Sequence, residues 1–140
     1  MKDIYSKVER TVNEKTDSAV YSIKASINFT DTHISDNDVF LSASTSSKVA
    51  FEDCSLTDID ATGQVIQLVS STLYLTNVII ENIIYSTTSS FYKISIVNKS
   101  AFYANKLTLL SIQGPLFYVS GATFSLTNDT LIEDCYNDDQ

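Results

Sequence analysis

Glycine and proline are nearly absent from this sequence of 140 residues, which contains three glycines and one proline. Glycine-rich phosphate-binding loops and the G-x-S-x-G nucleophile turn need several closely spaced glycines, so both are excluded. The tight turns of antiparallel hairpins also favour glycine or Asn-Gly. The scarcity of such residues therefore disfavours an antiparallel sandwich, the main all-β alternative.

Basic and potentially catalytic side chains are few as well. Nine Lys and Arg against 17 Asp and Glu give a net charge of −8, which disfavours binding to nucleic acid or to an anionic membrane. His33 is the only histidine, so a His-based zinc site cannot be assembled. Arg10 is the only arginine, and the acids Glu52 and Glu81 fall at different points of the repeats described below. We therefore predict no catalytic residue and no cofactor.

The acidic segment 31–38 is the best candidate for a metal site, because its oxygen-rich side chains suit Ca²⁺. It lacks the glycine and the terminal glutamate of an EF-hand loop, however, and a run of Asp, Asn and Ser indicates a turn first. We therefore predict no metal site here. The dispersed acids and lysines of the coils, Lys93 among them, are expected to be solvated surface charge.

Long apolar runs are missing too. The most apolar stretch, Val78-Ile79-Ile80, is interrupted at Glu81, far below the length of a membrane-spanning helix. Residues 1–7 are not followed by the apolar segment of a signal peptide. We expect no membrane insertion.

What the sequence does contain is a repeat. Ser and Thr make up 35 of the 140 residues, and five alternating apolar segments each end on Asn or Asp. The terminal residues lie 22, 24, 28 and 23 positions apart, a period typical of a solenoid. The five segments are 27–31, 49–53, 73–77, 101–105 and 124–128.

Two further short strands accompany each segment. Apolar strands at 39–43, 65–69, 92–97 and 116–119 precede four of them. An apolar residue follows three positions after the Asx in every coil except the fourth, which has Thr108 there. These residues are Ile34, Leu56, Ile80 and Leu131.

This order of strands predicts an all-β parallel β-helix of about five coils, at roughly 19–38, 39–62, 63–88, 89–113 and 114–136. Residues 1–18 are charged, with Ile4, Val8 and Val12 at four-residue spacing. They predict either a short capping helix or a degenerate sixth coil. The parallel β-helix would span residues 19–136, and residues 137–140 would form a frayed tail.

The Asx residues are expected to occupy one corner of each coil. Asn and Asp tolerate the left-handed backbone region and bond to local backbone groups, and identical residues can stack as a ladder. The predicted ladder comprises Asp31, Asp53, Asn77, Asn105 and Asn128.

The coils resemble the right-handed parallel β-helix repeats of the pectin lyase-like superfamily, especially those of large secreted or cell-surface proteins. That resemblance covers residues 19–136, and it implies a right-handed coil. Members of the superfamily include polysaccharide lyases and hydrolases, adhesins and structural shafts, so the fold alone selects no activity.

Three N-x-[ST] motifs predict N-glycosylation at Asn28, Asn98 and Asn128, of which Asn128 competes with the ladder. Cys54 and Cys135 fall in the second and fifth coils, about 14 Å apart along the axis, which is too far for a disulfide. They are expected to be free thiols or to bond to a neighbouring subunit. An intrachain disulfide would be expected only in a different fold.

A uniform fifth coil with no evident cap predicts head-to-tail stacking of copies. The leading hypothesis is a non-catalytic structural subunit or fragment of an extracellular or cell-surface filament, carrying covalent glycans. The alternative is an adhesion or carbohydrate-binding module that uses Tyr74 and Phe102 as exposed sugar platforms. A degenerate polysaccharide lyase or hydrolase is a third, less favoured hypothesis.

Overall fold

The computed structural model describes residues 8–9, 20–24, 26–35, 41–61, 64–85 and 92–135. In these ranges every element is a β-strand, and the strands pair in parallel. The described part of the chain therefore holds no helix long and apolar enough to cross a membrane. The predicted all-β parallel solenoid is confirmed, and the antiparallel sandwich is excluded.

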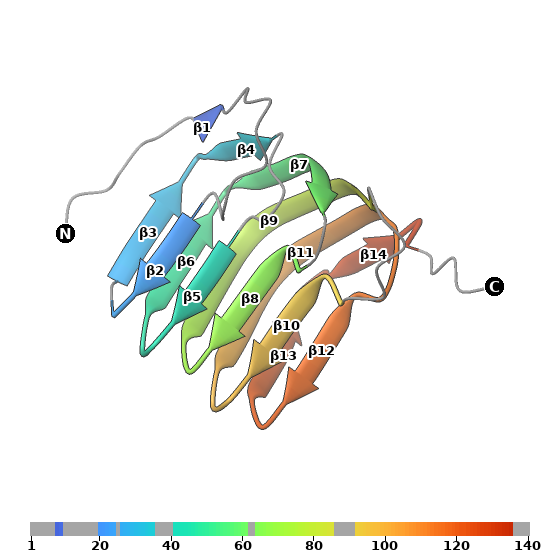
Figure 1. The fold of residues 1–140 in the computed structure, drawn as a ribbon. Helices are drawn as coiled ribbons and strands as arrows, with labels where there is room; N and C mark the ends of the chain where they lie inside the picture. The colour runs from blue at the N-terminus through green and yellow to red at the C-terminus, as the bar shows by residue number, and fades with distance from the viewer. Residues whose placement is uncertain are drawn as a thin grey trace.

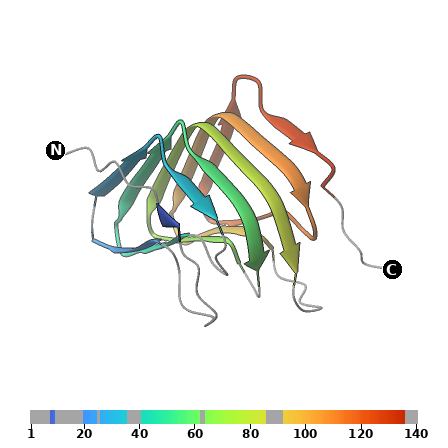
Figure 2. The ribbon, with the colours of Figure 1, turned by 90° about the horizontal axis from the view of Figure 1, so that it is seen from above.

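Each coil of the solenoid passes through three faces, which together enclose a roughly triangular cross-section (Figure 2). Face 1 is a separate five-stranded sheet, and its strands run in the order of the chain (Figure 1). It contains β2 (Val20–Ile23), β5 (Leu41–Ser44), β8 (Ile66–Val69), β10 (Ile94–Val97) and β12 (Phe117–Ser120).

Faces 2 and 3 belong to one nine-stranded sheet that bends at the corner between them. The long strands β9 (Thr72–Tyr85) and β11 (Ala101–Ile112) run across this corner and contribute to both faces. Face 2 also contains β3 (Ser26–Thr30), β6 (Lys48–Glu52) and β13 (Thr123–Thr127), and face 3 contains β1 (Val8–Glu9), β4 (His33–Ser35), β7 (Ser55–Ala61) and β14 (Leu131–Glu133).

The described strands thus form five coils, with about four complete turns between β2 and β12. Coils 1 to 5 are β2–β4, β5–β7, β8–β9, β10–β11 and β12–β14. Each strand pairs with its equivalent one coil away, so Val20 pairs with Leu41 and Leu73 pairs with Phe102. The step along the chain is therefore between 21 and 29 residues.

The core lies inside the triangle and consists of rows of stacked side chains. On face 2, Val49, Leu73 and Phe102 follow one another in register, and all three are fully buried. In the next inward row, the rings of Phe29 and Phe51 stack with centroids 4.6 Å apart and planes 3° apart. The alternation of buried and exposed residues predicted from the sequence produces these rows, because side chains of a strand point to opposite faces.

A row of buried serines joins the coils at the corner between faces 1 and 2. Ser47, Ser71 and Ser100 are 1–3% exposed. The Oγ of Ser71 accepts the backbone N–H of Ser47 at 3.2 Å and donates to the Val69 carbonyl at 3.0 Å. The Oγ of Ser100 accepts the N–H of Ser71 at 3.2 Å, so the hydroxyls of Ser71 and Ser100 each satisfy a buried backbone donor of the preceding coil.

The first 18 residues contribute one described strand. Val8 and Glu9 form β1, which pairs with Ile34 and Ser35 of β4 and so extends face 3 by one layer. The predicted capping helix is wrong at these two positions, because their backbone is extended and paired in the sheet. The strand agrees with the other prediction, a degenerate sixth coil, and the remainder of the predicted helix, like the predicted tail at 137–140, lies outside the described residues.

Candidate functional site

The corner between faces 2 and 3 holds the predicted Asx residues in the left-handed backbone region. Asp31, Asp53 and Asn77 have φ values of 50°, 53° and 52°. The Nδ2 of Asn77 donates to Oδ1 of Asp53 at 2.6 Å, so these two coils are joined by side chains as well as by backbone. The αL corner lets the chain turn from one face to the next within one residue.

Coil 4 departs from the predicted ladder. Asn105 pairs with Thr76, so the residue at the corner is Lys106, with φ of 57°. In coil 5, Asn128 returns to the corner with φ of 49°, and its Nδ2 donates to Oδ1 of Asn105 at 3.1 Å. Asn105 therefore lies in the strand, one residue before the corner that the spacing had assigned to it, and joins the ladder only through its hydrogen bond with Asn128.

We expect Lys106→Asn to raise the free energy of unfolding by about 0.5–1 kcal/mol, measured by urea denaturation. Asn is several-fold enriched over Lys in the αL region. Lys106→Gln is the matched control, because it removes the charge without supplying a residue suited to αL. Equal stability of the two variants would show that charge, not backbone preference, governs this corner.

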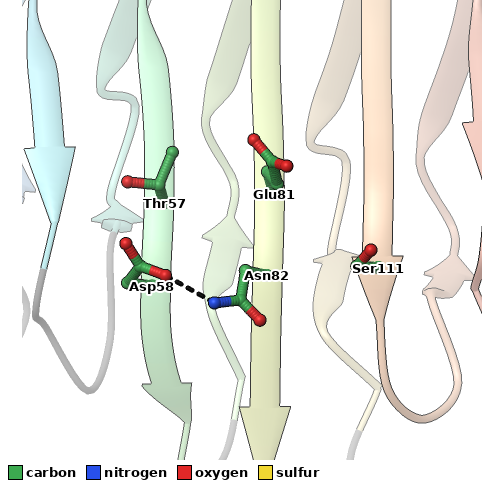
Figure 3. A pocket seen from close by; sticks show the side chains of 5 residues that line it. All are labelled: Thr57, Asp58, Glu81, Asn82 and Ser111. Atoms are coloured by element: carbon green, nitrogen blue, oxygen red, sulfur yellow. Dashed lines mark hydrogen bonds between the residues drawn. The ribbon is translucent and has the colours of Figure 1, made fainter.

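A second ladder, which the sequence reasoning missed, lies five residues further along coils 2 to 4 and six residues further along coil 5. Asp58, Asn82, Ser111 and Asp134 have φ values of 54°, 55°, 50° and 51°. Figure 3 shows the Nδ2 of Asn82 donating to Oδ1 of Asp58 on the neighbouring strand. Asp58 follows Asp53, and Asn82 follows Asn77, by five positions in the sequence. This repeated spacing was the signal that could have revealed the second ladder.

A shallow, open hollow of about 320 Å³ lies beside the second ladder on face 3. Thr57, Asp58, Glu81, Asn82 and Ser111 line it, and they come from β7, β9 and β11 (Figure 3). One of its two acids already accepts a hydrogen bond from the neighbouring amide. This arrangement holds the corner together, and it presents no nucleophile paired with a base.

The predicted candidates for charge-based chemistry do not converge in the described structure. Glu52 ends β6 on face 2, whereas Glu81 lies on face 3. The Nδ1 of His33 lies 2.7 Å from Oγ of Ser55 on the next strand of face 3. No group of three or more His, Cys, Asp or Glu within the described ranges is arranged so that it could hold a metal ion. Of the acidic segment 31–38, positions 36–38 lie outside them.

Lys93 is the one coil lysine whose placement corrects the prediction of surface charge. It is 1% exposed and lies immediately before β10, between coils 3 and 5. Its backbone N–H donates to the Pro115 carbonyl at 2.9 Å, and its carbonyl accepts from Val65 at 2.8 Å. The parallel stacking of the coils therefore fixes this residue inside the molecule.

Aromatic residues gather on the outer side of face 2. Tyr74 and Tyr103 are 37% and 38% exposed, and their rings stack with centroids 5.3 Å apart and an angle of 18° between planes. The Nζ of Lys48 lies 5.2 Å from the centroid of the Tyr74 ring, within the range of a cation–π contact. These three side chains form one exposed cluster on face 2.

The prediction that Phe102 shares this platform with Tyr74 is wrong. Phe102 is fully buried and stacks on Phe124 with centroids 5.3 Å apart. Its neighbour Tyr103 stands outside instead, because Phe102 pairs with inward Leu73. The exposed aromatic partner of Tyr74 is therefore Tyr103.

The three predicted glycan acceptors lie in different environments. Asn28 is on face 2 in β3 and is half-buried. Asn98 is exposed in the turn between faces 1 and 2, with φ of 55°. Asn128 is exposed, but its Nδ2, the atom that would carry a sugar, donates to Asn105. A sugar on Asn128 would replace one of the two Nδ2 hydrogens and so compete with the hydrogen bond to Asn105. Asn98 presents its side chain to solvent.

Both cysteines are free thiols, in coils 2 and 5. Cys54 is 4% exposed, its Sγ lies 3.2 Å from the Glu52 carbonyl, and burial raises the pKa of its thiol. Cys135 is half-exposed, with its Sγ 3.3 Å from the Glu133 carbonyl. Only Cys135 is accessible enough for the predicted bond to another subunit, which stays a prediction.

Iodoacetamide should therefore alkylate Cys135 at least about tenfold faster than Cys54 at pH 8, because the thiolate is the reacting form and burial disfavours it. Peptide mass spectrometry of a time course measures both rates. The Cys135→Ser variant should then react only slowly, and in urea Cys54 should react at the rate of an unfolded thiol. Equal rates in the folded protein would contradict the burial of Cys54.

The C-terminal end of the stack exposes residues that are buried elsewhere. Val119 is 41% exposed, whereas Ile96, its partner one coil earlier, is fully buried. Likewise, Ile132 is 46% exposed and its partner Leu109 is fully buried. The sequence predicted Leu131 as the inward residue here, but Ile132 takes that register because coil 5 has one additional residue after Asn128.

Comparison with known proteins adds no family or relative to this picture. No protein family model, no curated protein and no solved structure matches the chain.

Proposed function

We propose that this chain is a non-catalytic structural segment of an extracellular or cell-surface β-helical filament, extended by stacking of copies head to tail. The observation that carries the proposal is the end layer of coil 5. Its inward side chains, represented by Val119 and Ile132, keep a large exposed fraction, although they continue rows that are fully buried one coil earlier.

The backbone of the same layer supports the proposal. In the described structure, β12 pairs only with β10, and β13 and β14 pair only with β11. The outer edges of these strands carry N–H and C=O groups spaced for another parallel strand, and such edges readily pair with a further chain. A coil of a second copy would cover both the apolar rows and these polar groups.

The opposite end has matching edges on faces 1 and 2. There β2 pairs only with β5, and β3 pairs only with β6, among the described strands. On face 3, in contrast, β1 already covers β4. Direct stacking of β12 on the β2 of another copy would place β14 in the layer that β1 holds, so β1 is displaced when face 3 of the joint closes.

The acidic surface fits this role, because a net charge of −8 repels filaments laterally while a joint formed by apolar rows and backbone stays short-ranged. We also propose that the coil is right-handed, as in the pectin lyase-like repeats that the sequence resembles, and that Asn28 and Asn98 carry glycans. Sugars on these side chains would keep neighbouring filaments apart. Asn98 lies in coil 4, away from both ends, and Asn28 lies on the edge strand β3 beside Ala50, in an outward row that takes no part in the apolar joint.

Electron microscopy of the natively sourced protein tests the proposal. Filaments with an axial repeat of about 24–29 Å are expected, which corresponds to five or six layers about 4.8 Å apart. Particles that remain single solenoids at every concentration would overturn it. Mass spectrometry of the same sample tests the glycans separately, since bare Asn28 and Asn98 would remove them from the proposal and leave the stacking intact.

A further inference from the structure

The outward side chains of face 2 form a row in which two stacked rings are flanked by small side chains. Strand register places Ala50, Tyr74, Tyr103 and Ser125 side by side in coils 2 to 5. Coils 3 and 4 contribute stacked rings, and coil 5 contributes a serine. The face of the Tyr103 ring that is turned toward coil 5 therefore lies next to a small side chain, where a further ring would fit.

The two ends of the tyrosine pair differ. On the side of coil 2, the Nζ of Lys48 lies 5.2 Å from the centroid of Tyr74 and occupies its ring face. On the other side, a depression of about 160 Å³ extends along face 2. It is lined by Tyr74, Leu75, Thr76, Tyr103, Ala104, Asn105, Ser125 and Thr127.

Polar groups surround this depression without adding charge. The Asn105 side chain accepts from Asn128 through Oδ1, and no hydrogen bond among the described residues uses its Nδ2. Thr127 donates its hydroxyl to the Ala104 carbonyl and keeps lone pairs to accept. Ser125 adds a hydroxyl-bearing side chain to the lining. None of the lining residues is ionisable at neutral pH.

We propose that this depression binds one pyranose ring of a neutral glycan, stacked on Tyr103 above Ser125. One face of such a ring carries C–H groups, which complement the negative face of an aromatic ring. Its rim carries hydroxyls, which can accept from Asn105 Nδ2 and donate to Thr127. A planar apolar ligand would leave these polar groups unpaired, and an acidic sugar would find no cation in the lining.

The proposal is independent of the filament, because outward side chains of face 2 form the site, whereas inward side chains and backbone edges of coil 5 form the joint. A stacked copy would continue the row on the far side of Ser125 without covering Tyr103. Either proposal can therefore fail alone.

The test is NMR titration of the folded chain with maltohexaose, laminarihexaose and chitohexaose, following the tyrosine ring protons. Saturable shifts at Tyr74 and Tyr103 are expected with at least one of these neutral hexasaccharides. Tyr103→Ala should weaken that binding about tenfold. No saturable shift with any of the three, or binding of hexagalacturonate alone, would overturn the proposal.

Two further variants separate binding from folding. Ser125→Tyr supplies a further ring, so it should fill the depression and abolish binding while the thermal unfolding temperature is retained. Tyr118→Ala removes an equally exposed tyrosine from face 1 and should leave binding unchanged. Wild-type affinity in Ser125→Tyr, or equal losses in Tyr103→Ala and Tyr118→Ala, would contradict the assigned site.

Discussion

Phe102→Ala should lower the free energy of unfolding by about 3–5 kcal/mol, the cost of removing a buried aromatic ring from a core. Phe102 is fully buried, stacks on Phe124 and meets the edge of Phe117 with centroids 6.3 Å apart. Its loss would open a cavity between coils 4 and 5 that neighbouring strands cannot close, because their backbones are held in register. Urea denaturation monitored by circular dichroism measures the change.

Tyr103→Ala is the matched control, since it removes an aromatic ring from the next residue of the same strand. Tyr103 is 38% exposed and makes one ring stack, so its loss should cost about 0.5–1.5 kcal/mol. The pair of variants also tests the strand register of coil 4. A larger effect of Tyr103→Ala than of Phe102→Ala would mean that the two faces of β11 have been exchanged.

Val119→Lys should abolish head-to-tail stacking while leaving the single solenoid folded. Val119 is 41% exposed at the end of the stack, so a lysine there can reach water in the monomer. In the proposed joint the same ammonium would be buried against the next copy. Leaving a charge unpaired in an interface costs several kcal/mol, which weakens association roughly a hundredfold or more. Sedimentation velocity over a range of concentrations measures this loss.

Tyr118→Lys controls for the added charge, because Tyr118 is the preceding residue of β12 and points away from the core on face 1. It is 45% exposed, which is close to the exposure of Val119. This variant should assemble like the wild-type chain. If both variants assembled equally well, the end layer of coil 5 would not be the joint, whatever the state of the filament.

The register of coil 4 shows where sequence reasoning was misled. Aligning the repeats on their Asx residues placed Asn105 at the corner, and so Phe102 outside. The structure instead pairs Asn105 with Thr76 and buries Phe102 and Ala104. A shift of one residue exchanges every side chain between the two faces of a strand. The free energy gained by burying Phe102 is larger than the cost of placing Lys106, instead of Asn105, in the αL region.

The sequence contained a warning of this shift at Thr108. In the other coils an apolar residue stands three positions after the Asx, whereas coil 4 has threonine there between two leucines. The leucines Leu107 and Leu109 are fully buried, and Thr108 is only half-buried on the outward side. Alternation over the whole strand was thus a better guide than one matching Asn.

The fold itself could be predicted because each coil repeats the same alternation, which identifies inward residues such as Val49, Leu56 and Leu73. The second ladder escaped because it is chemically mixed, with Ser111 between Asn82 and Asp134, and its left-handed backbone leaves no composition signal of its own. The aromatic row required strand register, since Tyr74 and Tyr103 are separated by 29 residues, one full coil. Spacing alone could not place Ser125 beside them.

Stacking by register gives the molecule a direction in which it is mechanically weak. Backbone hydrogen bonds between coils lie along the solenoid axis, so a force on the two ends of the stack pulls these bonds apart one layer at a time. Each layer released would free one coil, 21 to 29 residues by the pairings of Val20 with Leu41 and Leu73 with Phe102, or roughly 70–100 Å of extended chain. Optical-tweezer extension should therefore show a staircase of similar steps, and a single rupture of the whole chain would contradict this layer-by-layer release.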